Sequence, residues 1–89
     1  MYFIANWKMH GNTADINKSK SVIKLSNLKK YKILKIIYCP PFTLLKTFFD
    51  KFKNSNVFIG AQNCHSVSEY GAYTGSVNAK LIKYTGAKY

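Results

Sequence analysis

The 89 residues carry 14 lysines, no arginine and only three acidic residues, which gives a formal net charge of +11. A hydrophobic content of 47% and an aromatic content of 16% are typical of a globular protein and exclude an intrinsically disordered chain. The absence of arginine disfavours specific nucleic-acid recognition, because arginine supplies the bidentate contacts that read bases best, so a solvated lysine surface is the favoured interpretation.

The two cysteines, Cys39 and Cys64, lie far apart and form no CxxC motif. They are expected to be reduced thiols rather than a disulfide. No long apolar run begins the chain, since Lys8 and His10 interrupt it early. No signal peptide or membrane span is therefore predicted, and the expected location is the cytoplasm.

The first predicted element is a buried apolar strand over residues 2–5, followed by a turn at Gly11. Successive side chains on a strand alternate between its faces, so Asn6 and Lys8 are expected to point one way and Trp7 the other. Ligands of α/β folds bind at the carboxyl tips of strands. An amide and a cation at such a tip suit a small anionic ligand with an oxygen to polarise.

A helix is predicted next, capped by Asn12 or Thr13 and running to about residue 27, with Asp15 in its first turn. A β-branched strand over residues 33–38 follows, and Pro40 and Pro41 end it. The second predicted helix has one apolar stripe, formed by Phe42, Leu45, Phe49 and Phe52.

A third strand is predicted over residues 57–61, and a polar loop without periodicity occupies residues 62–75. Ser76 is expected to cap a short helix that has Val77, Leu81 and Tyr84 on one face and ends at Gly86. Residues 87–89 read as the opening of a fourth strand.

Strands that alternate with helices through short connections predict a parallel sheet with helical crossovers. Three and a half such units leave open sheet edges and uncovered apolar faces. We therefore expect residues 1–89 to be the N-terminal part of one larger domain, cut at the start of its fourth strand, and to be poorly folded or prone to aggregation in isolation.

Three sequence motifs in order carry a resemblance to a known family. They are Phe3-Ile4-Ala5-Asn6-Trp7-Lys8-Met9, Pro40-Pro41-Phe42-Thr43-Leu44-Leu45, and Gly60-Ala61-Gln62-Asn63 followed by Gly71-Ala72-Tyr73-Thr74-Gly75. With them the chain resembles triosephosphate isomerase over its whole length. The resemblance implies an α/β fold, the (β/α)₈ barrel, of which these residues form roughly the first third.

The resemblance also implies an isomerase that interconverts dihydroxyacetone phosphate and glyceraldehyde 3-phosphate in glycolysis and gluconeogenesis, without cofactor or metal, as a homodimer. Asn6 and Lys8 match the pair that contacts substrate, and Lys8 would stabilise negative charge on the reacting molecule. Thr74 matches a threonine that reaches into the partner subunit near its Asn-Lys pair. Met9, Tyr73 and Gly75 would lie at the same interface.

The chain departs from the family pattern at several points. The family's catalytic histidine and glutamate are not among these residues, so residues 1–89 alone are expected to be inactive. Glu69 cannot replace that glutamate, because the resemblance puts it in the interface loop. His10 stands where the family usually has asparagine, and Ser76 where it usually has glutamate.

Two other interpretations remain open. The charge of +11 allows a small basic α/β module that binds nucleic acid or protein non-specifically, which a salt titration would reveal. The loop over residues 62–75 could instead dock a stand-alone interaction protein onto an intact barrel. A metal site or a thiol nucleophile at Cys64 and His65 is disfavoured, because no further ligands stand at suitable spacing.

Overall fold

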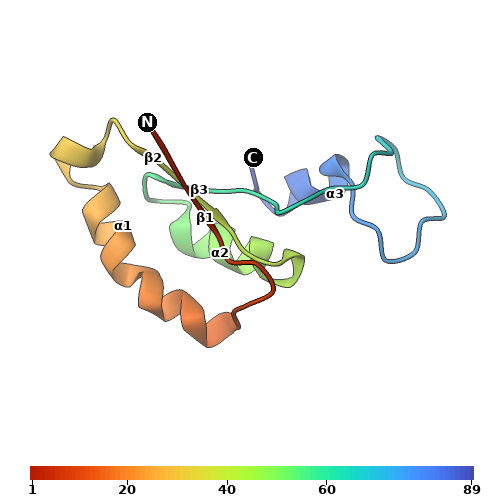
Figure 1. Cartoon of the computed structure of the whole chain (residues 1–89), viewed down its shortest axis with the longest axis horizontal. Coiled ribbons are helices and arrows are strands. Elements are labelled where there is room, and N and C mark those ends of the chain that lie inside the picture. Colours follow the sequence, from red (N-terminus) through yellow and green to blue (C-terminus); the bar gives the residue numbers. More distant parts are fainter.

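The computed structural model describes all 89 residues as an elongated chain of about 46 × 26 × 20 Å. Its centre is a three-stranded sheet in the order β1-β2-β3. The strands are β1 (Tyr2–Asn6), β2 (Lys35–Cys39) and β3 (Val57–Ile59), and both pairings are parallel. The prediction of a parallel sheet with helical crossovers is confirmed (Figure 1).

Two of the predicted strands are longer than the observed ones. The second strand begins at Lys35 rather than residue 33, because the Leu34 backbone N–H bonds to the Tyr31 carbonyl in a turn and leaves Ile33 exposed. β3 ends at Ile59, although the Gly60 N–H still donates to the Tyr38 carbonyl at 2.8 Å. Regular pairing between β2 and β3 therefore ends at the carboxyl tip of the sheet, close to where the polar segment begins.

The first predicted helix is present, but it has two parts. Residues Thr13–Ser19 form a 3₁₀ helix, and α1 (Lys20–Ser26) continues it. Asn12 is the cap: its Oδ1 accepts the N–H groups of Ala14 and Asp15, and the Asp15 carboxylate accepts the Asn12 N–H. Lys18 pairs with Asp15 three residues away, a spacing that the 3₁₀ helix brings into line.

The second helix, α2 (Leu45–Phe52), follows a 3₁₀ turn at Phe42–Leu44 and covers the sheet. The predicted stripe was incomplete, because Phe48 is fully buried and Phe49 only half-buried. The face that meets the sheet carries Leu45, Phe48 and Phe52, at positions i, i+3 and i+7. Phe49 turns instead toward Gly86, where an added Cβ would lie 2.4 Å from its ring.

The buried core lies between α2 and one face of the sheet, with additions from the neighbouring helices. Its members are Ile16, Tyr38, Leu44, Leu45, Phe48, Phe52, Val57, Ile59, Ile82 and Ala87. The Phe48 ring stands edge-on to Trp7 with their centroids 4.8 Å apart, and the Phe52 ring meets Tyr38 at 5.3 Å. Edge-to-face aromatic pairs of this kind add to the stability that burial supplies.

The third helix, α3 (Ala79–Tyr84), shows that the predicted cap was wrong. Asn78, not Ser76, caps it, because the Asn78 Oδ1 accepts the Leu81 N–H at 3.0 Å. Ile82 is its buried residue, whereas Leu81 and Tyr84 are exposed. Gly86 at φ 91° ends this segment as predicted.

Residues 87–89 run beside β3 as the opening of a fourth strand would. The Lys88 N–H donates to the Ile59 carbonyl, and the Ala61 N–H donates to the Tyr89 carbonyl, both at 2.8 Å. These bonds do not yet make a regular strand.

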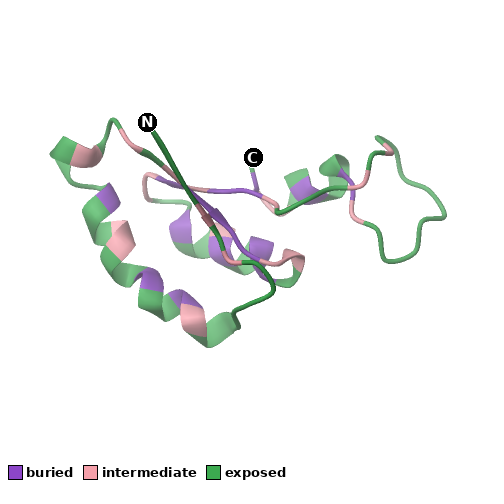
Figure 2. Cartoon of the chain, in the orientation of Figure 1, coloured by how far each residue is buried: buried purple, intermediate pink, exposed green.

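The prediction that the first strand is buried was wrong. Phe3 is 52% exposed and Ile4 is 65% exposed, whereas Val57 and Ile59 of β3 are almost completely covered (Figure 2). β1 is an edge strand that pairs only with β2, and α1 stands away from it in Figure 1. None of the helices is long and apolar enough to cross a membrane.

Candidate functional site

The candidate site is the carboxyl tip of the sheet, where β1 gives way to Trp7 and Lys8. Asn6 is the register partner of Cys39, and the Trp7 N–H extends the pairing by donating to the Cys39 carbonyl at 3.1 Å. The sequence after β3 brings Gln62 to the same tip. Parallel strands thus gather three chain segments at one edge of the sheet.

Trp7 anchors this tip to the core. Its ring packs against Phe48 and lies 6.1 Å from the Tyr38 ring, on the helix-covered face. Gly11, at φ 105°, closes over it, since an added Cβ there would sit 2.8 Å from a Trp7 ring carbon. The tip is therefore fixed from behind by aromatic packing.

The backbone leaves the extended conformation at Lys8. Its φ is 57°, the only positive value at a residue other than glycine. Placing a side chain in this left-handed region costs about 1–2 kcal/mol. The alternation of side chains along the first strand therefore ends before Lys8. The expectation that Lys8 and Asn6 point the same way rested on that alternation and does not apply here.

Hydrogen bonds hold Lys8 in this conformation from both sides. The Asn6 Oδ1 accepts the Lys8 N–H at 2.8 Å, and the Gln62 Nε2 donates to the Lys8 carbonyl at 2.7 Å. The same Gln62 amide donates to the Cys39 carbonyl at 2.9 Å. Gln62 therefore ties the tips of all three strands together.

Sequence reasoning placed Gln62 in a family motif but gave it no role. An amide side chain that directly follows a third strand was the available signal, because such a group can reach the unpaired carbonyls of neighbouring tips. Its partner at Lys8 is 54 residues away in the chain, which no local pattern reveals.

The tip offers positive charge and hydrogen-bond donors. The Asn6 Oδ1 is occupied, so the amide NH₂ is the part of this exposed side chain that remains to donate. Lys8 is exposed and has no carboxylate partner, because the three acidic residues pair with Lys18, Lys46 and Lys80. Such a tip can bind an anion and polarise an oxygen on it.

The buried thiol of Cys39 takes no part in this chemistry. Burial raises the pKa of Cys39, which keeps it a neutral thiol at physiological pH. Its sulfur faces the backbone of Gly60, where an added Cβ would come within 3.0 Å. Cys64, in contrast, is exposed.

The other candidate residues lie apart from Asn6 and Lys8. Residues 62–78, which we name the arm, extend away from the sheet (Figure 1). They carry Tyr73, Thr74 and Gly75, all of them exposed. Met9, beside Lys8 in the chain, is 93% exposed. Within this chain the structure does not bring Thr74 to the Asn6–Lys8 tip.

Polar contacts give the arm its shape. The buried Asn78 donates to the Glu69 carbonyl at 3.0 Å and to the Ser68 carbonyl at 3.4 Å. The Glu69 carboxylate pairs with Lys80 at 2.6 Å. The backbone N–H of His65 donates to the Val77 carbonyl at 2.7 Å and so joins the two ends of the arm.

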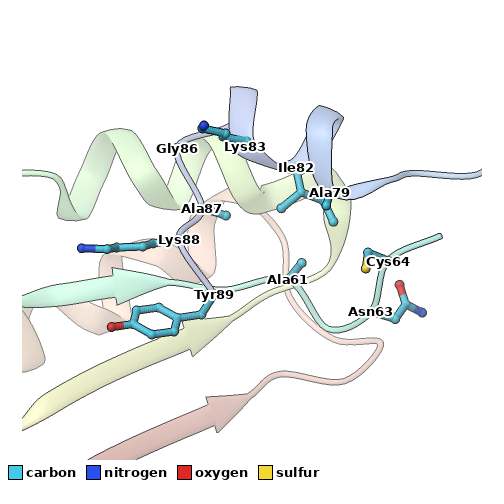
Figure 3. A pocket seen from close by; sticks show the side chains of 10 residues that line it. All are labelled: Ala61, Asn63, Cys64, Ala79, Ile82, Lys83, Gly86, Ala87, Lys88 and Tyr89. Carbon is cyan, nitrogen blue, oxygen red and sulfur yellow. The ribbon is translucent and has the colours of Figure 1, made fainter. Parts of the chain in front are cut away.

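The largest cavity, of about 640 Å³, lies beyond β3 rather than at the tip (Figure 3). Its lining comes from the segment after β3, from α3 and from the last residues of the chain: Ala61, Asn63, Cys64, Ala79, Ile82, Lys83, Gly86, Ala87, Lys88 and Tyr89. Neither Asn6 nor Lys8 lines it, and its walls are mainly apolar. It is not part of the candidate site.

Comparison with known proteins identifies relatives over the whole chain. The triosephosphate isomerase family model matches residues 1–89. Triosephosphate isomerase of Wolbachia pipientis wMel is 37% identical over 97% of this chain and 34% of its own length, and that of Bartonella henselae is 34% identical over 98% and 34%. The chain spans about a third of the length of these curated relatives.

A solved structure agrees with the sequence relatives. The crystal structure of triosephosphate isomerase from Bartonella henselae superposes with a TM-score of 0.82 at 33% identity, over 97% of this chain and 34% of that one. The expectation that this sheet and its helices are the first β/α units of a barrel is confirmed.

Proposed function

This chain belongs to the triosephosphate isomerase family, and we propose that it supplies the substrate-binding lysine and asparagine of an enzyme that interconverts dihydroxyacetone phosphate and glyceraldehyde 3-phosphate. The observation that supports this most is the left-handed Lys8, held between Asn6 and Gln62 at the carboxyl tip of the sheet. A strained residue that is fixed by several bonds is typical of a functional site.

The proposed roles follow from the groups that the tip leaves free. In this isomerisation a proton moves between adjacent carbons, and negative charge develops on an oxygen. The Lys8 ammonium would stabilise that charge together with the charge of the phosphate. The Asn6 NH₂ would donate to a substrate oxygen. Gln62 would keep Lys8 in place, so that little reorganisation is needed during the reaction.

The base and the electrophile of the family are not among residues 1–89, so the proposal concerns these residues within a complete barrel. The proposal also includes assembly of that barrel into a homodimer. The exposed Tyr73, Thr74, Gly75 and Met9 would form the interface, with Thr74 reaching the partner's Asn6–Lys8 tip. The proposal also includes the cytoplasm as the location of the protein, which agrees with two unpaired cysteines.

A non-specific binding module is not favoured, because the family match covers the whole chain.

A hybrid enzyme tests the proposal. Residues 1–89 would replace the aligned third of the Bartonella henselae enzyme, and isomerase activity would be measured. We expect saturable activity that K8M lowers by about 10²–10³-fold in kcat/KM, as loss of one charge-stabilising group does. The matched control is K20M, because Lys20 is also exposed but lies at the start of α1, away from the tip.

Two results would contradict the proposal. One is an active hybrid in which K8M and K20M behave alike. The other is saturable turnover by purified residues 1–89 alone, because such activity would need a base that the family does not place in this segment.

A further inference from the structure

His65 holds a turn of the arm through an unprotonated ring nitrogen. Its half-buried imidazole accepts the Val67 backbone N–H at Nδ1, over 3.2 Å. The ring also packs against Tyr73, with centroids 5.0 Å apart and an interplanar angle of 38°. One side chain therefore supports both the turn at the base of the arm and an aromatic residue near its end.

This arrangement depends on the charge state of the imidazole. A neutral imidazole can accept a hydrogen bond at Nδ1, whereas the protonated ring carries N–H at both nitrogens and accepts none. Protonation would set two N–H groups against each other and leave the Val67 N–H without its partner. Histidine is the residue type that changes charge between pH 5 and 8.

The titratable groups that share a cavity with His65 come from the arm itself, and α3 adds one charged side chain that is paired with Glu69. The cavity that His65 lines also holds Glu69, Tyr70 and Tyr73, and the Glu69 carboxylate is already bound by Lys80 of α3. A second cavity that His65 lines also holds Cys64, Asn63 and Ser76.

We propose that His65 is a pH-sensitive switch for the shape of the arm. With a neutral imidazole the turn to Val67 is closed; with a protonated imidazole the turn opens, and the ring that packs on Tyr73 is no longer fixed by the Val67 bond. The effect on subunit association rests on the proposed function, in which Tyr73 and Thr74 contact the partner. The effect on the turn itself does not.

Amide hydrogen exchange at Val67, followed by NMR at pH 8 and pH 5.5, tests the switch in the hybrid enzyme. Relative to intrinsic exchange rates, protection should fall about tenfold on acidification, as loss of one hydrogen bond predicts. H65N is the matched variant, since its Oδ1 can accept as Nδ1 does but does not titrate. It should keep Val67 protected at both pH values, and H65A should leave it unprotected at both.

Equal protection of Val67 at both pH values in the parent protein would overturn the switch. So would a pH dependence that persists in H65N, because another group would then be responsible. Sedimentation of the hybrid at the same two pH values is the second readout. A switch at Val67 without any change in association would leave the turn established and count against the proposed interface alone.

Discussion

The packed core and the arm are stabilised by different interactions. In the packed core, which is α2 with β2 and β3, apolar side chains such as Phe48 and Phe52 are completely buried. In the arm, residues 62–78, almost every side chain is exposed, and hydrogen bonds that Asn78 donates and His65 accepts set the shape. The core should therefore respond to changes in volume, and the arm to changes in hydrogen bonding and protonation. The predictions below use the hybrid enzyme and compare free energies of unfolding in urea.

The largest effect is expected for F48A in the packed core. Removing a fully buried phenylalanine costs about 3–5 kcal/mol, because it takes away apolar contacts and leaves a cavity. I33A is the control, since Ile33 is 79% exposed, and should cost less than about 0.5 kcal/mol. Similar losses for the two variants would show that α2 does not pack on the sheet as described.

The next effect separates two glycines that both have positive φ. G86A forces a Cβ within 2.4 Å of the Phe49 ring, whereas Gly75 in the arm has nothing within 4 Å. Both variants should lose about 1–2 kcal/mol from the left-handed backbone. G86A should lose about 1–3 kcal/mol more from overpacking. These values hold for one subunit; an equally large loss for G75A in the hybrid would mean that the partner subunit covers Gly75, as the proposed interface requires.

A smaller effect tests which residue caps α3. N78A removes the bond to the Leu81 N–H and the donations to the arm, and should cost about 1–2 kcal/mol. S76A should change the free energy of unfolding by less than about 0.5 kcal/mol, because Ser76 caps no helix. A larger loss for S76A than for N78A would support Ser76 as the cap, as the sequence predicted.

The smallest effect is expected for K80M, which breaks the ion pair with Glu69. Both partners are substantially exposed, and exposed pairs contribute less than about 1 kcal/mol. The difference between parent and variant should shrink further at high salt, because counterions screen the pair. A loss as large as that of N78A would mean that charge rather than hydrogen bonding holds the arm.

Several features followed from sequence alone because local chemistry determines them. Asn12 caps its helix with an oxygen that reaches N–H groups two and three residues away. Gly86 follows α3 because a left-handed residue is needed there. Alternating apolar strands and helices with short connections gave the parallel sheet, and the tip that carries Asn6 came with it.

Other features depended on contacts between distant segments. No local pattern shows that Gln62 donates to the Lys8 carbonyl, or that Asn78 rather than Ser76 caps α3. The role of Phe48 depended on which face of α2 meets the sheet. Each of these was decided by the neighbours that the fold supplies, not by the residue itself.

The two outer strands show most clearly which features depend on local sequence and which depend on tertiary contacts. β1 and β3 are both short apolar runs and look alike in the sequence, yet Ile4 is 65% exposed and Ile59 only 3%. Sequence determined that both segments are strands, because apolar and β-branched residues favour extended backbone. Only the tertiary structure decided which one is buried: β3 has α2 on one face and residues 88 and 89 along its edge, whereas β1 pairs with β2 alone.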